Sequence, residues 1–226
     1  MKTELSILIP IHNEAKTLPI LAPRLVQVLK EMQCTWQVWY INDGSSDTTA
    51  ALLKDLTFKY SNVYYHTLPF NMGQYEAIKQ GFHLFKSKYV VIMDGDGQDR
   101  PEEIPNLYKK AKEGYDVVFA KRSQKAYGVD KVLLSMSFHW VLSRMTETVQ
   151  DHQIAGFGIY SYSILVEKSK ERYTIFYLPA LCQWQNIKVT SIPVIHGRRL
   201  EGQSKYGLKK RVKLAWKILL EYGISF

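Results

Sequence analysis

Short apolar runs and longer amphipathic stretches alternate along the first 120 residues of the chain. The runs at 6–11 and 89–93 are almost wholly apolar, as strands buried on both faces usually are. The stretch at 17–32 instead repeats its apolar residues at helical spacing. Strands that alternate with helices build βαβ units, so the pattern predicts an α/β fold with a single, Rossmann-like, mostly parallel sheet flanked by helices.

Turn residues help to place the individual elements. Proline in the first turn and glycine after the last one delimit a helix at 101–113. The predicted strands are 6–11, 36–41, 63–66, 89–93 (the central one) and 116–120, and the predicted helices are 17–32, 47–60, 75–85 and 101–113. In the later half, 129–146 has helical spacing, 187–195 alternates like a strand, and 154–162 is too rich in glycine to assign.

Positive charge is concentrated in the C-terminal segment 188–226. This segment contains nine basic and two acidic residues, which accounts for +7 of the formal net charge of +9. Within this segment, 208–222 places apolar residues on one side and basic residues largely on the other, so we predict a basic amphipathic helix. Such a helix lies in an anionic membrane interface or packs on its own core, and the pattern leaves both alternatives open.

Composition narrows the class of protein. The chain has 226 residues, 46% of them hydrophobic and 23% charged, which is typical of a folded globular domain. Two cysteines form no disulfide framework or zinc motif, so we expect a reducing compartment. The apolar run at 5–11 is too short for a signal peptide, and no run reaches the 18 or so apolar residues of a membrane span. We therefore expect neither secretion nor membrane spanning by this chain.

Polar loops follow several predicted strands at their carboxyl ends, where open α/β sheets bind ligands. Asp94 and Asp96 follow the strand 89–93 directly, with the carboxamide of Gln98 next to them. Hard oxygen donors of this kind suit Mg²⁺ or Mn²⁺, which keep part of their coordination shell for phosphate oxygens. The alternative to a metal site is a purely structural acidic turn that caps the helix beginning at 101.

Other ligand classes fit the sequence less well. An EF-hand calcium loop that began at Asp94 would need glutamate at its twelfth position, where the chain has Pro105. No Gly-x-Gly-x-x-Gly motif is present, and the glycine pair at 202 and 207 is followed by Leu208 instead of the lysine of a P-loop. The basic segment has charge but no nucleic-acid recognition motif, so we expect no nucleic-acid partner.

Five short motifs, in order and spacing, resemble glycosyltransferase family 2, the inverting enzymes with a GT-A fold. The resemblance is strongest to the polyprenyl-phosphate glycosyltransferases, such as dolichyl-phosphate mannose synthase and the bacterial undecaprenyl-phosphate sugar transferases. The motifs are Pro10-Ile-His-Asn-Glu14, Asn42-Asp-Gly-Ser-Ser-Asp-Thr-Thr49, Asn71-Met-Gly73, Asp94-Gly-Asp-Gly-Gln-Asp-Arg-Pro-Glu102 and Arg199-Leu-Glu-Gly-Gln-Ser-Lys-Tyr206. The chain departs from the family pattern at His12, Asn42, Phe70 and Gly97, which leaves the nucleotide base open.

The resemblance implies a role for each matching position. It implies a GT-A catalytic domain at 1–206 and an amphipathic, juxtamembrane helix at 207–226. The donor-binding residues would be Pro10, His12, Glu14, Ile41, Asp43, Gly95 and Arg122; the ligands of Mg²⁺ or Mn²⁺ would be Asp94, Asp96 and Gln98; and the catalytic residues would be Asp96, Asp99, Arg199 and Lys205.

The activity implied is transfer of a sugar, with inversion, from a UDP- or GDP-sugar to a polyprenyl phosphate at the cytoplasmic face of the membrane. The enzyme would be peripheral to that anionic surface or anchored there, as a monomer or a homo-oligomer. A lipid phosphate is already anionic and needs no strong base, whereas a sugar hydroxyl would need one, with Asp99 or Asp151 as candidates. Two alternatives stay open: a soluble transferase with a saccharide acceptor in surface polysaccharide synthesis, and a non-catalytic GT-A module that binds nucleotide.

Overall fold

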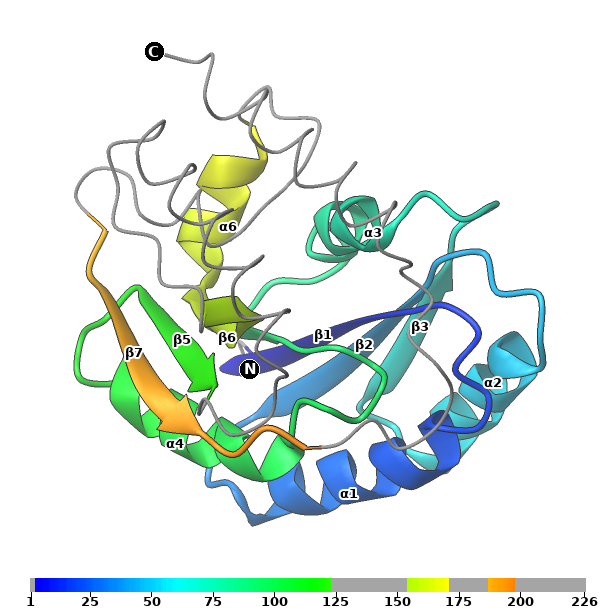
Figure 1. Cartoon of the computed structure of the whole chain (residues 1–226), viewed down its shortest axis with the longest axis horizontal. Coiled ribbons are helices and arrows are strands. Elements are labelled where there is room, and N and C mark those ends of the chain that lie inside the picture. Colours follow the sequence, from blue (N-terminus) through cyan, green and yellow to red (C-terminus); the bar gives the residue numbers. More distant parts are fainter. Residues whose placement is uncertain (1–2, 123–153, 171–186, 198–226) are drawn as a thin grey trace, which may run out of the picture.

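The computed structural model describes residues 3–122, 154–170 and 187–197. These residues contain one seven-stranded sheet with the order β3-β2-β1-β4-β6-β5-β7 (Figure 1). Every described pairing is parallel except the two that β6 makes with β4 and β5. The strands are β1 (Leu5–Ile11), β2 (Trp36–Asn42), β3 (Val63–Thr67), β4 (Tyr89–Ile92), β5 (Val117–Arg122), β6 (Ile154–Ser161) and β7 (Val189–Val194).

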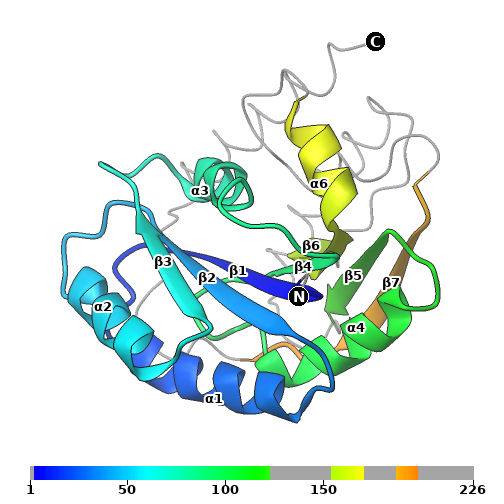
Figure 2. The ribbon, with the colours of Figure 1, turned by 180° about the vertical axis from the view of Figure 1, so that it is seen from behind.

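Helices cover both faces of this sheet (Figures 1 and 2). One face is covered by α1 (Leu18–Glu31), α2 (Thr49–Lys59) and α4 (Ile104–Ala111), the last preceded by a single 3₁₀ turn, η1 (Pro101–Glu103). The other face is covered by α3 (Gln74–Gly81) and α6 (Tyr162–Ser169). The helix predicted at 75–85 thus ends earlier, at a glycine, a residue that favours helix ends.

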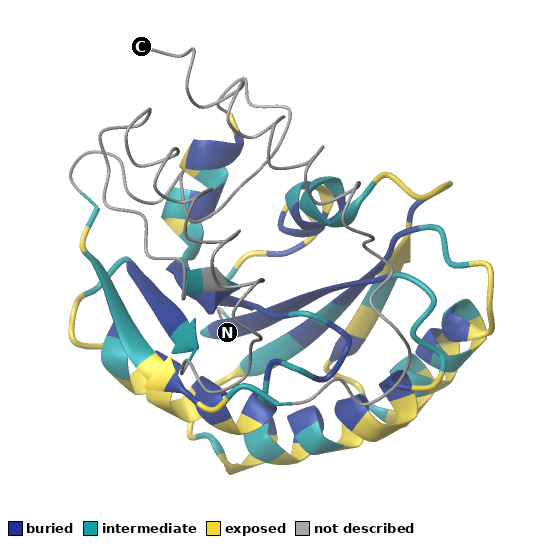
Figure 3. Ribbon diagram, viewed as in Figure 1, coloured by how far each residue is buried: buried dark blue, intermediate teal, exposed yellow. Residues whose placement is uncertain are grey.

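The core is divided between these two faces because side chains alternate along each strand. In β1, Ile7 and Ile9 pack on the side of α1, whereas Leu8 packs on the side of α3. All seven residues of β1 are buried, and Figure 3 shows the buried band that runs through the centre of the sheet. The apolar runs read from the sequence are therefore the middle strands, as predicted.

The glycine-rich stretch that the sequence left unassigned is strand β6. It runs antiparallel between β4 and β5. A Cβ at Gly158 would lie 2.8 Å from the carbonyl oxygen of Val118, so glycine lets β6 approach β5 closely. Tyr160 is buried next to it and packs edge-on against Phe119. The prediction of a mostly parallel sheet is confirmed, with this one antiparallel insertion.

The topology brings several loops to one edge of the sheet, because the parallel strands all end there. Among the described residues, these loops follow β1, β2, β3, β4 and β7, and Arg122 ends β5 on the same side. Within the described ranges, no helix combines the length and the apolar character needed to cross a bilayer. The helices predicted at 129–146 and 208–222, and the candidates Asp151, Arg199 and Lys205, lie outside the described residues.

Candidate functional site

The loops after β1 and β2 are held together by Asn13 and His12. Asn13 has a φ of 55°, in the left-handed region that asparagine tolerates better than most residues. Its Oδ1 accepts the backbone N–H of Ser46 at 2.8 Å. His12 Nδ1 donates to the carbonyl oxygen of Asp43 at 2.7 Å, which places the proton of a neutral ring on that nitrogen. These contacts fix the position of the two loops relative to each other, and together the loops form one side of the candidate site, called here the Asp43 wall.

Asp43 connects this wall to the loop before α3. Its Oδ1 accepts the N–H of Met72 at 2.7 Å, and its Oδ2 accepts the N–H of Gly73 at 2.9 Å. Asp43 is 4% exposed, and both partly buried bonds go to a charged acceptor, which makes them stronger than bonds between neutral groups. The motif pieces at 10–14, 42–49 and 71–73, far apart in sequence, therefore meet at one place.

Asn42, where the family pattern has aspartate, has a structural role. Its side chain is fully buried. The Oδ1 atom accepts the N–H of Ser45 at 3.1 Å, and Nδ2 donates to Thr67 Oγ1 at 3.3 Å. Because an amide can make both bonds, asparagine supports the turn that carries Asp43.

Other predicted donor-site residues are buried in the sheet or contact neighbouring protein groups. Pro10 and Ile41 are adjacent partners on β1 and β2, and both are buried; Ile41 packs in the core on the side of α3. Glu14 accepts a hydrogen bond from the hydroxyl of Thr17 at 2.9 Å, just before α1. Gly95 is required sterically, because a Cβ there would lie 2.4 Å from Cγ2 of Ile11.

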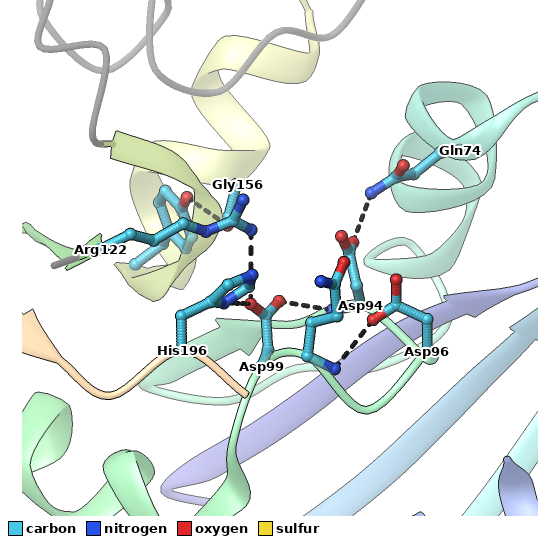
Figure 4. Close-up of polar contacts among 9 residues, drawn as sticks. Gln74, Asp94, Asp96, Asp99, Arg122, Gly156 and His196 are labelled. Atoms are coloured by element: carbon cyan, nitrogen blue, oxygen red, sulfur yellow. Dashed lines mark hydrogen bonds and ion pairs between the residues drawn. The ribbon is translucent and has the colours of Figure 1, made fainter. Parts of the chain in front are cut away.

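The loop after β4 carries the predicted metal ligands. Figure 4 shows Asp94 and Asp96 next to each other on this loop. Asp96 is 8% exposed, and its Oδ1 accepts the N–H of Gln98 at 2.9 Å, which folds the loop back on itself. Gln74, from the first turn of α3, donates from Nε2 to Asp94 Oδ1 at 2.6 Å. The sequence reasoning missed Gln74, although it directly follows the Asn71-Met72-Gly73 motif.

Asp99 is the last residue of this loop and is 1% exposed. Its Oδ2 accepts the N–H of Asp94 at 2.9 Å, and its Oδ1 lies 3.5 Å from Arg122 Nη2 and 3.7 Å from His196 Nδ1 (Figure 4). Its carboxylate thus contacts protein groups on three sides, and these contacts brace the loop. Burial raises the pKa of Asp99, and the Arg122 guanidinium opposes that change.

His196 is the second residue that the sequence reasoning missed. It follows β7, whose last residue, Val194, is the register partner of Arg122 on β5. Burial, together with the nearby charge of Arg122, lowers the pKa of His196 to about 4, so the ring is neutral at physiological pH. Gly197 N donates to the carbonyl oxygen of Gln98 at 2.8 Å, which fastens the segment after β7 to the Asp94–Asp99 loop. The rule that strand ends carry ligand residues applies here too and would have selected His196.

The charges of this loop fit a divalent cation. Burial, followed by the neighbouring carboxylates of Asp99 and Asp96, raises the pKa of Asp94 to about 7. Among the described residues, no group of three or more histidine, cysteine, aspartate or glutamate side chains gathers as a metal site. The protein would thus offer two carboxylates and the Gln98 carboxamide, a donor set that suits Mg²⁺ or Mn²⁺ with diphosphate oxygens completing the shell.

Comparison with known proteins gives concordant findings. Residues 6–172 match the family described as Glycosyl transferase family 2. The chain is 30% identical over 218 residues to the undecaprenyl-phosphate 4-deoxy-4-formamido-L-arabinose transferase of Pectobacterium carotovorum, with 95% of this chain and 66% of the relative covered. It therefore spans slightly less than two thirds of that relative's length.

Solved structures resemble the fold at low sequence identity. The glucosyl-3-phosphoglycerate synthase from Mycobacterium tuberculosis, in complex with Mn²⁺, UDP and glucosyl-3-phosphoglycerate, has a TM-score of 0.68 at 14% identity, with 99% of this chain and 81% of that chain covered. A mannosyltransferase from Pyrobaculum calidifontis, in complex with GDP-Man and Mn²⁺, has a TM-score of 0.61 at 12% identity, with 90% and 59% covered. At such identities the likeness concerns the fold alone.

Proposed function

The chain belongs to glycosyl transferase family 2 and has the predicted GT-A fold, and from this premise we propose that it transfers a sugar from a nucleotide-sugar to undecaprenyl phosphate. One observation carries the proposal: the loop that carries Asp43 and the loop that carries Asp94 and Asp96 lie close together, where the parallel strands end. The names of the curated relatives, which include the sugar acceptor, support the choice of acceptor.

Each wall of the site has a part in donor binding. The loops joined by His12 and Asp43 would hold the nucleoside, because their partly buried hydrogen bonds keep these loops in one arrangement. Asp94, Asp96 and Gln98 would hold Mg²⁺ or Mn²⁺ against the diphosphate. When bound, the cation supplies positive charge that stabilises the leaving nucleoside diphosphate. Arg199 and Lys205 are proposed, from their motif alone, to bind phosphate.

The reaction needs no strong base in this proposal. An anionic oxygen of the lipid phosphate forms a bond to the anomeric carbon while the bond from that carbon to the diphosphate oxygen breaks. Attack from the opposite face inverts the anomeric configuration. A hydroxyl acceptor would instead require a base, for which Asp99 and Asp151 remain the candidates.

The acceptor implies a place in the cell. Undecaprenyl phosphate is a lipid, so the site would work at the cytoplasmic face of a membrane, and nucleotide-sugars would reach it from the cytoplasm. The basic sequence of 207–226 supports contact with an anionic leaflet, at about 1 kcal/mol for each basic residue near the surface.

A transfer assay tests this function. The full chain is incubated with Mn²⁺, a panel of UDP- and GDP-sugars, and anionic vesicles that contain undecaprenyl phosphate, and the lipid product is identified by mass spectrometry. We expect one donor to give a glycosylated lipid, with transfer lost in Asp96→Asn and kept in Asp55→Asn, an exposed aspartate on α2. Transfer to a free saccharide without lipid, or no transfer and no nucleotide binding, would overturn the proposal.

A further inference from the structure

Gln74 lies between the two halves of the site. It is the first residue of α3, and its amide reaches across to Asp94 Oδ1 at 2.6 Å (Figure 4). The bond is short, and its acceptor is a carboxylate surrounded by two further carboxylates, Asp96 and Asp99. A donor in this position selects one orientation of the Asp94 carboxylate, since Oδ1 is turned toward α3 and Oδ2 is not used by this contact.

The position of Gln74 is itself determined by Asp43. The two residues that precede Gln74, Met72 and Gly73, donate their backbone N–H groups to the two oxygens of the Asp43 carboxylate. Gly73 has a φ of 95°, so the chain turns sharply there before α3 begins. A continuous path of contacts therefore leads from the loops joined by His12 and Asp43, through the start of α3, to the Asp94 carboxylate, which is expected to hold the cation.

We propose that Gln74 is a positioning residue for the cation site, and that Asp43 acts on that site through the start of α3. This inference rests on the proposed function, because it concerns the same cation. Gln74 keeps the carboxylate of Asp94 turned so that its second oxygen is presented next to Asp96. Asp43 sets where the helix begins, so the pocket that receives the nucleoside also arranges the ligand that receives the metal.

The test measures Mn²⁺ alone, by the electron paramagnetic resonance signal of free Mn²⁺ during titration of the full chain. Gln74→Met keeps the length of the side chain and removes its donor, and Gln74→Ala is a second variant. Gln80→Met is the matched control, because Gln80 lies on the same helix, is exposed and bonds only to Glu76 in the contacts described for its amide. Partners that orient metal ligands typically contribute roughly 10- to 100-fold in metal affinity, so we expect a loss of that order for Gln74→Met and none for Gln80→Met.

Asp43→Ala extends the test to the full path. Asp43 makes no described hydrogen bond to Asp94, and no nucleotide is added, so the variant can act through the loop at 72–73 or through the loss of its own negative charge. Salt screens the charge effect, so a loss of Mn²⁺ affinity that persists at high ionic strength passes through the loop, and one that disappears there would overturn this part of the inference. We expect Mn²⁺ affinity to fall in this variant as well, with a thermal unfolding midpoint that shows it is folded at the assay temperature.

The outcomes separate the two ideas. Wild-type binding of Mn²⁺ with equal binding by Gln74→Met and Gln74→Ala would overturn the inference and leave the proposed function standing. Equal losses in Gln74→Met and Gln80→Met would also overturn it, because the effect would then belong to the helix. A wild-type chain that binds no Mn²⁺, alone or with UDP or GDP, would overturn the cation site and the proposed function with it.

Discussion

Substitution of Gly95 by alanine tests how closely the Asp94–Asp99 loop packs on the sheet. The added Cβ would lie 2.4 Å from Cγ2 of Ile11, where carbon atoms in contact normally stand about 3.5–4.0 Å apart. Ile11 is 3% exposed and belongs to the core, so it has little room to move. The loop must therefore shift by about 1 Å or the core must deform.

The size of the effect follows from two opposing contributions. Overpacking of a well-packed core costs about 1–3 kcal/mol. Alanine restricts the unfolded chain more than glycine does, which returns about 0.4–1 kcal/mol. We expect a net loss of about 1–2 kcal/mol in the free energy of unfolding, or a midpoint lower by roughly 2–8 °C for a chain of this size.

Gly156→Ala is the matched control. A Cβ at Gly156 meets no heavy atom of the described residues within 4 Å, so we expect only the effect on the unfolded chain, and this variant should be as stable as the wild type or slightly more stable. Urea unfolding followed by circular dichroism gives both values. Gly95→Ala should also weaken Mn²⁺ binding, since residue 95 stands between Asp94 and Asp96. Equal stability of the two alanine variants would refute the packing argument, as would a cost in Gly95→Ala that does not shrink when Ile11 is also changed to alanine.

Further predictions concern the stability of the sheet, the reactivity of a thiol and the removal of the cation. Gly158→Ala should lower the free energy of unfolding by about 1–3 kcal/mol in urea titrations, because its Cβ would press on the carbonyl oxygen of Val118 at 2.8 Å. Glu103→Ala should cost about 0.5–1.5 kcal/mol in the same assay, because the N–H of Ile195 loses a partly buried hydrogen bond that water replaces at this exposed residue. Burial raises the pKa of Cys34, so its alkylation by iodoacetamide, followed by mass spectrometry of its peptide, should reach half its maximal rate at a higher pH than in the urea-unfolded chain. Removal of divalent cations by EDTA should abolish nucleotide binding in calorimetry, and binding that persists would contradict the cation site.

The strands and the loops at their ends were readable from sequence because each depends on neighbouring residues. The runs predicted at 36–41 and 63–66 are the strands Trp36–Asn42 and Val63–Thr67, confirmed almost to the residue. Their aromatic and β-branched residues favour strands, and the wholly buried strands β1 and β4 are nearly all apolar, so both signals are visible locally. The parallel order of these strands then placed the loops of Asp43 and Asp94 at one edge, as the pattern predicted.

The contacts within the site depend on residues far apart in the chain, and sequence carries no local sign of them. Gln74 meets Asp94 only because α3 packs across β1 and β2, next to β4, and His196 meets Asp99 only because β7 pairs with β5. Strand β6 was not predicted for the same reason. Glycine is needed at 158 because the backbone of β5 lies close to it, and not because of its neighbours in sequence. Local propensity and periodicity therefore determined which elements form. Tertiary packing alone decided which side chains touch, because hydrogen bonds and close contacts depend on distances in space.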